Sequence, residues 1–215
     1  MPKLYGNRMS PYVRKVRMVL AIKGIQYEHD EVSPFNIGEE YRRNIHPMGK
    51  IPAYEEDGWI LPDSSAICSY IDNTSPSPGL IVGNARDKAQ IIWWEEFLDT
   101  AFMQKLAGPF FVENVLKPRF LNQPADTALL KIVDQQLANT VLEVLDRQLQ
   151  HNKYIYGNQL SIADVAFAAF YRAAFLGGFR LEKRGFKRVE ELWKLLSATE
   201  GIKDVIMDEN RFLAG

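Results

Sequence analysis

Three short segments of this 215-residue chain combine polar side chains with local geometry that suits a small charged ligand. In the first, Ser10 stands between a short strand pattern and a helix pattern, and Pro11 follows it. Serine is a favoured N-cap and proline a favoured first helical residue, so capping alone explains the pair. A helix N-terminus also stabilises an anion, and a thiolate held there would have a pKa below the ~8.5 of a free cysteine thiol. The two roles are compatible, because a capping hydroxyl can also face a ligand.

The second segment runs from Pro47 to Pro52 and contains Lys50 and Ile51. Taken alone it is typical of a loop that enters a strand. Only about 5–6% of X–Pro bonds in folded proteins are cis. A cis Ile51–Pro52 bond would turn the backbone N–H and C=O of Ile51 outward, where an extended peptide-like ligand could pair with them as an added strand does.

The third segment, Asp63-Ser64-Ser65, begins a predicted helix. Asp63 is a natural N-cap, which is the simpler interpretation. The same group also suits the head group of an amino acid, because the Asp63 carboxylate could bind an ammonium. The hydroxyl and amide of Ser64 could then bind the carboxylate of that ligand.

Composition narrows the function classes further. The chain has 26 basic and 27 acidic residues, a net charge of -1, which argues against a nucleic-acid binder or a protein held to anionic lipid. Its single cysteine, Cys68, excludes an internal disulfide and is expected to be a small core side chain. The three histidines lack ligand spacing, so no metal site is predicted. With no leader pattern and no apolar stretch near the roughly 20 residues that span a bilayer, we expect a cytosolic protein.

The elements that must position these segments change character along the chain. Strand patterns at 3–5 and 27–32, a hairpin at 51–61 with an Asp57-Gly58 turn, and helices at 13–24 and 64–72 predict a small α/β domain. In the first helix, Arg14, Lys15 and Arg17 are expected on outer faces. After a Pro-rich segment at 73–79, helical patterns cover 86–106, 127–149, 161–175 and 189–198. We therefore predict an α/β domain at 1–78, a linker at 79–85 and an all-helical domain at 86–215.

Taken together, four motifs in a fixed order resemble one family. They are Ser-Pro-Tyr-Val-Arg-Lys-Val-Arg from Ser10, Gly-Lys-Ile-Pro from Gly49, Asp-Ser-Ser-Ala-Ile from Asp63 and Ser-Ile-Ala-Asp from Ser161. The chain is similar along its whole length to the cytosolic glutathione S-transferases with a serine active site. The resemblance implies a thioredoxin-like N-terminal domain, an all-α C-terminal domain, a cytoplasmic homodimer and a role in detoxification. The Ser161–Asp164 box also fits a helix-capping box.

The resemblance implies a role for each matching residue. Ser10 would donate its hydroxyl to the sulfur of glutathione, the co-substrate, and no metal would be needed. Ile51, before a cis proline, would pair with the cysteinyl backbone, and Lys50 would face the glycine carboxylate. Asp63 and Ser64 would hold the γ-glutamyl end. A hydrophobic electrophile would occupy a pocket formed by Tyr12, Phe110 and Phe111, of which the two phenylalanines are expected to be partly open.

Two departures leave the class of transferase open. His46 stands before Pro47 where the family often has asparagine, and Asp63 stands where it often has glutamate or glutamine. No cysteine lies near residue 10, which disfavours the cysteine-based members. Two other functions remain: a glutathione-dependent peroxidase or disulfide reductase that uses the same thiolate, and a non-enzymatic binding or regulatory protein with this fold.

Overall fold

Four short strands form the sheet of the first compact unit, which comprises Met1–Leu80 and the chain from Ala198 on. The computed structural model describes residues 1–214. The strand order is β2-β1-β3-β4; β1 and β2 are parallel, and the other neighbouring pairs are antiparallel. The elements of this unit are β1 (Lys3–Tyr5), α1 (Pro11–Ile22), β2 (Glu28–Asp30), α2 (Glu39–Asn44), β3 (Ala53–Glu56), β4 (Trp59–Pro62), α3 (Ser64–Thr74) and α11 (Ile202–Ala214).

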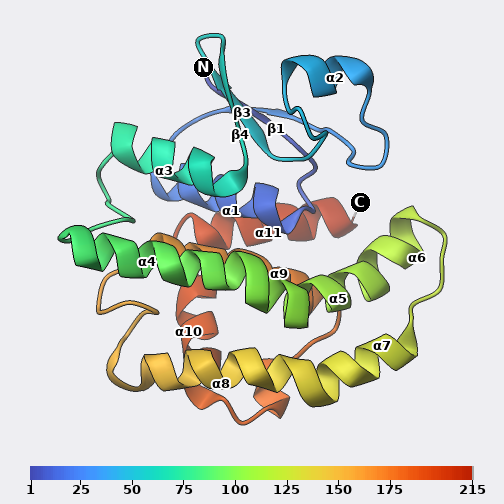
Figure 1. Cartoon of the computed structure of the whole chain (residues 1–215), viewed down its shortest axis with the longest axis vertical. Helices are drawn as coiled ribbons and strands as arrows, with labels where there is room; N and C mark the ends of the chain where they lie inside the picture. The colour runs from blue at the N-terminus through green and yellow to red at the C-terminus, as the bar shows by residue number, and fades with distance from the viewer. Residues whose placement is uncertain (215) are drawn as a thin grey trace. The chain divides into compact units, whose positions relative to one another are not determined.

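The hairpin between β3 and β4 closes as the sequence predicts. Asp57 and Gly58 both have positive φ, 51° and 80°, which is the requirement of a type I′ turn. Helices α1 and α3 lie side by side against one side of the sheet, and α2 lies apart from both (Figure 1). The predicted strand and helix order of this unit is confirmed, except that α2 and α11 were not predicted.

Helix α1 is buried more completely than its sequence pattern indicates. Val13, Val16 and Leu20 form the predicted core stripe and are fully buried. The expectation that Arg14 and Lys15 lie on outer faces is wrong, because both are fully buried, and Arg17 is 5% exposed. Helix α11 covers one flank of α1 and α3 covers another, so a face that would be solvated in an isolated helix is enclosed here. Gly24, with φ +67°, ends the helix as expected.

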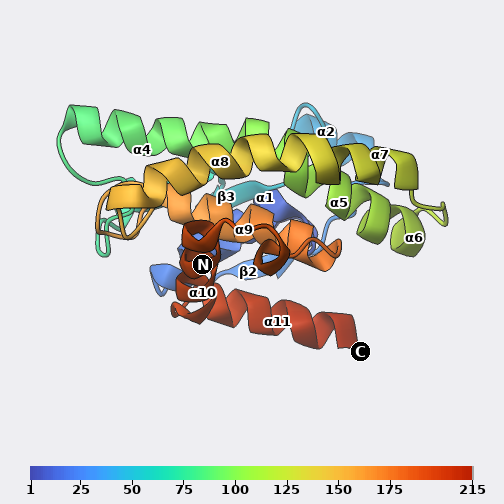
Figure 2. The same ribbon diagram turned by 90° about the horizontal axis from the view of Figure 1, so that it is seen from below.

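The second compact unit, Ile81–Ser197, contains helices and no strand among its described residues, as predicted. Its chain forms two long rods, Ala85 to Phe120 and Thr127 to His151, which Figure 1 and Figure 2 show in green and yellow. The first rod contains α4 (Ala85–Phe97), η1 (Leu98–Ala107), α5 (Gly108–Phe111), η2 (Val112–Leu116) and α6 (Lys117–Phe120). The second contains α7 (Thr127–Ile132), η3 (Val133–Leu137), α8 (Ala138–Gln148) and η4 (Leu149–His151), and the remaining elements are α9 (Ile162–Leu176), η5 (Leu181–Lys183) and α10 (Lys187–Ala198).

Helix α9 forms the core of the second unit. Almost all of its residues are buried, and it packs against α4, η1 and α5. The predicted capping box at its start is confirmed: the Ser161 backbone N–H donates to Asp164 Oδ2 at 2.9 Å. Burial raises the pKa of Asp164 to about 6, against the effect of the hydrogen bonds that its carboxylate accepts. Across residues 1–214, no helix has the length and apolar character needed to cross a membrane.

The division into units differs from the predicted domain limits at one place. The junction after Leu80 lies within the predicted linker at 79–85. We expected the chain from residue 86 to its end to form one helical domain. Instead, the chain from Ala198 on packs within the first unit, because α11 docks on α1.

Candidate functional site

Ser10 sits at the N-cap of α1 and is half-buried. Its Oγ accepts a hydrogen bond from the backbone N–H of Val13 at 3.5 Å, the outer limit for such a bond. Among residues 1–214 the Ser10 hydroxyl donates no hydrogen bond. The cap is therefore weak, and the O–H lies at the positive end of the helix dipole without an acceptor among the described residues.

Ile51 presents backbone groups beside this helix. The Ile51–Pro52 bond is cis. Within the described part of the chain, neither the N–H nor the C=O of Ile51 makes a hydrogen bond. Lys50 is exposed, and its carbonyl accepts a hydrogen bond from the Tyr41 hydroxyl at 3.0 Å. The loop thus offers a free donor, a free acceptor and a solvated ammonium in two consecutive residues.

Asp63 precedes α3 with an unusual backbone. Its φ is +67°, a region that non-glycine residues avoid and that costs about 1–3 kcal/mol. The capping interpretation of its side chain is wrong, because the carboxylate makes no cap hydrogen bond and is 73% exposed. Ser64, the first residue of the helix, is 5% exposed. The strained residue therefore holds a carboxylate out toward solvent, next to the N–H groups of the first helical turn.

His46 lies under Asp63 and was assigned no role from the sequence. The Met48 N–H donates to its Nδ1 at 3.2 Å, which places the proton of a neutral ring on Nε2. That Nε2 is buried without a hydrogen-bond partner and lies 3.6 Å from Asp63 Oδ1. The histidine that replaces asparagine therefore places a buried ring nitrogen next to the Asp63 carboxylate, without a hydrogen bond between them.

Short links bring the three segments together at one end of the first unit. Gly6, with φ +146°, lets the loop before Ser10 pass so close to Ile51 that a Cβ there would lie 3.2 Å from the Ile51 Cβ. The Asp63 N–H donates to the Pro52 carbonyl at 3.3 Å. The buried ammonium of Lys15 on α1 donates to the Ser65 hydroxyl at 3.1 Å. Ser10, Ile51 and Asp63 thus belong to one connected surface.

Of the three residues predicted for the electrophile pocket, two are buried and one is half-buried. Tyr12 is half-buried in the first turn of α1. The expectation that Phe110 and Phe111 are partly open is wrong: they are 8% and 4% exposed, and the Phe110 ring packs edge-on against Phe179. They belong to the core of the second unit.

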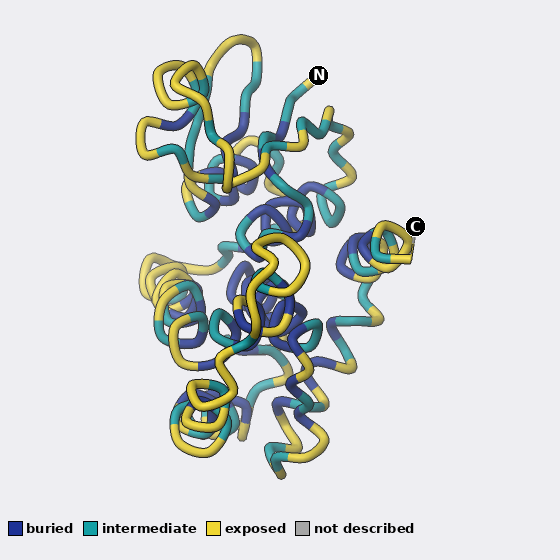
Figure 3. Tube along the Cα trace, turned by 90° about the vertical axis from the view of Figure 1, so that its right-hand side faces the viewer, coloured by how far each residue is buried: buried dark blue, intermediate teal, exposed yellow. Residues whose placement is uncertain are grey.

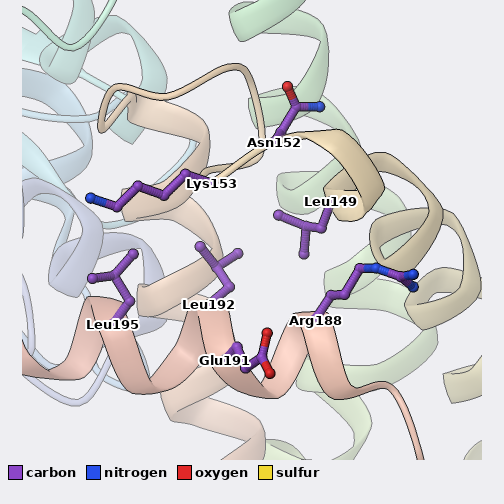
Figure 4. A pocket seen from close by; sticks show the side chains of 7 residues that line it. All are labelled: Leu149, Asn152, Lys153, Arg188, Glu191, Leu192 and Leu195. Atoms are coloured by element: carbon purple, nitrogen blue, oxygen red, sulfur yellow. The ribbon is translucent and has the colours of Figure 1, made fainter.

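A hollow of about 230 Å³ does open within the second unit (Figure 4). None of the residues predicted for the site lines it; the lining residues are Leu149, Asn152, Lys153, Arg188, Glu191, Leu192 and Leu195. Cys68 is buried, as expected of a small core side chain. In residues 1–214 no three histidine, cysteine, aspartate or glutamate side chains are grouped to hold a metal ion.

Two family models match most of the chain. The model of the glutathione S-transferase N-terminal domain matches residues 4–79, and the model of the C-terminal domain matches residues 111–208. The glutathione S-transferase 3 of Zea mays is 30% identical over 173 residues, 77% of this chain and 75% of that protein. With its mixed four-strand sheet and helical second unit, the chain belongs to the glutathione S-transferase family.

Solved structures support the same fold. A glutathione S-transferase III in apo form superposes with a TM-score of 0.80 at 26% identity, covering 96% of this chain and 95% of that one. Glutathione transferase F2 of Populus trichocarpa gives a TM-score of 0.85 at 23% identity, covering 98% and 100%, which bears on the fold alone. One relative is of another kind: the elongation factor 1-gamma of Schizosaccharomyces pombe is 25% identical over 93% of this chain, which spans 49% of that protein.

Proposed function

We propose that this protein is a glutathione transferase that binds glutathione, stabilises its thiolate and directs it to a hydrophobic electrophile. The observation that carries the proposal is the Ser10 hydroxyl, half-buried at the N-terminus of α1 with its donor unused. That donor lies beside the free backbone groups of Ile51, so one ligand could use both.

Binding follows from the groups around Ser10. Glutathione is an extended tripeptide, so its cysteinyl backbone can pair with the free N–H and C=O of Ile51. The exposed Lys50 ammonium would meet the glycine carboxylate. At the other end, the Asp63 carboxylate would bind the γ-glutamyl ammonium, and the amide and hydroxyl of Ser64 would bind its carboxylate.

Ser10 acts on the sulfur as a hydrogen-bond donor. A hydrogen bond to a charged acceptor is worth about 1.5–3 kcal/mol, which corresponds to a drop of about one to two units in thiol pKa. The proton leaves for solvent, the sulfur forms a bond to the electrophilic carbon, and the leaving group takes its electron pair away. Binding the thiolate and the electrophile next to each other would accelerate the reaction further. Tyr12, which is half-buried on the first turn of α1, is the pocket residue best placed to contact the electrophile.

A non-enzymatic role is the second candidate, and the elongation factor among the relatives favours it. Such a protein would keep the fold without needing an open Ser10 donor. In the peroxidase and disulfide reductase alternatives the same thiolate attacks a peroxide or a mixed disulfide instead of an electrophilic carbon.

We also propose that the protein is a cytosolic homodimer. The exposed indoles of Trp59 on β4 and Trp93 on α4, 48% and 51% exposed, are suited to a subunit interface.

Retention on immobilised glutathione and turnover of two substrates separate these functions. We expect the chain to be retained and to conjugate an aryl halide faster than it reduces an organic hydroperoxide. Replacing Ser10 with alanine should abolish most of the conjugation while retention persists. The matched control is Asn84→Ala, which removes the N-cap of α4 in the other unit. Retention without turnover of either substrate would support a binding protein, and no retention would contradict the proposal.

A further inference from the structure

One arginine holds the peptide on either side of Ser10. Arg14, fully buried on α1, donates its backbone N–H to the Ser10 carbonyl at 2.9 Å. Its guanidinium Nη2 donates to the Met9 carbonyl at 3.2 Å. Met9 itself is 1% exposed, and its N–H donates to Asn7 Oδ1 at 3.0 Å. The Arg14 side chain therefore holds the carbonyl of the residue before Ser10, while its bond to the Ser10 carbonyl belongs to the backbone of α1.

The counter-ion of Arg14 comes from the far end of the chain. Arg14 Nε lies 2.5 Å from Glu209 Oε1 on α11, and both side chains are fully buried. The buried residues of α11 are Ile202, Val205 and Glu209, a spacing that places them on one face of the helix. Figure 3 shows this helix at the C-terminus, dark blue on one side and yellow on the other. A carboxylate therefore stands on the buried face of α11, beside Ile202 and Val205, and its partner is the guanidinium of Arg14.

Stability alone does not account for a charge at this position. Burying an ion pair costs desolvation, and well-packed apolar residues in its place are often as stable or more so. An arginine that must satisfy a loop carbonyl, by contrast, needs a buried partner for its charge. The same loop reaches α11 a second time, because Arg8 lies over the Phe212 ring at 4.8 Å and 3.4 Å from Asp208 Oδ2.

We propose that Glu209 is a positioning residue: through the guanidinium of Arg14 and the Met9 carbonyl, helix α11 fixes the orientation of the Ser10 hydroxyl toward the glutathione sulfur. The inference rests on the proposed function of Ser10. It gives the C-terminal helix a role in thiol activation that acts through the Arg14 guanidinium. Glu209 and Arg14 act as one unit, so the loss of either should have the same consequence as the loss of both.

The opposite end of α1 supplies a matched control. Lys23 Nζ lies 2.6 Å from Asp72 Oδ1, with the two side chains 0% and 9% exposed. This ammonium also donates to the carbonyls of Ser75 and Pro78, and it makes no contact with the Ser10 loop. Asp72→Asn thus removes a buried carboxylate from the same unit, at the contact of α1 with α3 instead of α11, and the Lys23 ammonium has no hydrogen bond to Met9.

The test compares Glu209→Gln and Arg14→Lys with Asp72→Asn in the full-length chain. The thiolate absorbance of bound glutathione, followed against pH, gives the pKa of the bound thiol. Affinity for S-methylglutathione, which has no thiol proton, reports ligand binding separately. In Glu209→Gln and Arg14→Lys we expect the pKa of the bound thiol to rise by about one unit, which lowers the ratio of thiolate to thiol tenfold at a given pH. The affinity for S-methylglutathione should change little. The double variant should shift no further, and Asp72→Asn should keep the wild-type pKa although it melts earlier.

The outcomes separate the inference from the function beneath it. If the wild type lowers the thiol pKa and both variants keep that value while melting like Asp72→Asn, Glu209 only anchors α11, and the inference falls alone. If the wild type leaves the thiol pKa at its ordinary value, the proposed function falls and takes the inference with it. Should Glu209→Gln not fold, Arg14→Lys and Glu209→Asp decide by the same measurement.

Discussion

Ser10 and Ser161 are both helix N-cap residues, and the two serines are used differently. Ser161 at the start of α9 is 1% exposed, and its hydroxyl donates to Asp164 Oδ2 at 2.8 Å inside a closed capping box. Ser10 at the start of α1 is half-buried, accepts one long hydrogen bond and donates none among the described residues. Residue type and position in the helix are the same. The difference is that the protein supplies an acceptor for the Ser161 hydroxyl and, among the described residues, none for the Ser10 hydroxyl.

The largest expected effect is at the closed cap. Asp164→Ala removes the acceptor of the Ser161 N–H, the Ser161 hydroxyl and the Ile155 N–H, all buried. Leaving these donors unpaired should cost roughly 3–5 kcal/mol of unfolding free energy, measured by urea denaturation. Activity per folded molecule should not change. A variant as stable as the wild type would contradict the assignment of this cap to folding alone.

The closed cap also predicts a pH dependence. Because burial raises the pKa of Asp164 to about 6 in the folded chain, the folded state binds more protons than the unfolded state between about pH 4 and 6. This residue's contribution to stability is therefore present below about pH 4 and lost as pH rises through 6, by roughly 2–3 kcal/mol. Denaturation of the wild type and of Asp164→Asn at pH 4.5 and 7 isolates it. The unfolding free energy of the wild type, relative to that of Asp164→Asn, should be higher at pH 4.5 than at pH 7. An equal difference at the two pH values would contradict the shifted pKa.

Asp63 tests whether backbone strain accompanies the proposed binding of glutathione. Asp63→Gly should relieve the positive φ and stabilise the fold by up to about 1 kcal/mol while weakening glutathione binding at least about tenfold. Asp57→Gly is the control, because Asp57 also has positive φ but lies in the hairpin turn. Calorimetric titration and thermal melting should show a gain in stability for both and a loss of binding only for the first. Equal binding by both variants would remove Asp63 from the site.

The smallest effect is the stability that the open cap contributes. With its hydrogen bond at 3.5 Å, Ser10→Ala should lower the unfolding free energy by less than about 0.5 kcal/mol. Asn84→Ala, which removes a cap with bonds of 2.8 and 3.2 Å, should cost about 1 kcal/mol. A larger loss for Ser10 than for Asn84 would mean that its hydroxyl serves the fold first.

Local sequence signals predicted much of this molecule. The turn at Asp57-Gly58, the cap glycine at Gly24 and the box at Ser161 depend on neighbours within a few residues, and all are as expected. The residues proposed for the site also lie together in the first unit, apart from Phe110 and Phe111. What a single side chain would do was harder to foresee, since Ser10 and Ser161 differ only through their surroundings.

The parts that sequence reasoning missed depend on contacts far along the chain. The pair formed by Arg14 and Glu209 joins residues 195 positions apart, so a charged side chain that looks solvated in α1 is buried by a helix no local pattern identified. In α11 the third buried position is a glutamate, which weakens the apolar periodicity that predicts a helix. The positive φ of Asp63 likewise has no local signature, because aspartate is also an ordinary N-cap.

The central claim is that the open serine keeps the sulfur of glutathione ionised. The most direct measurement is the pKa of the bound thiol in the wild type and in Ser10→Ala, each saturated with glutathione. The wild type should hold it about one to two units below the ~8.5 of a free cysteine thiol, and Ser10→Ala should return it to that value. A bound thiol with the same low pKa in both proteins would show that the hydroxyl does not stabilise the thiolate.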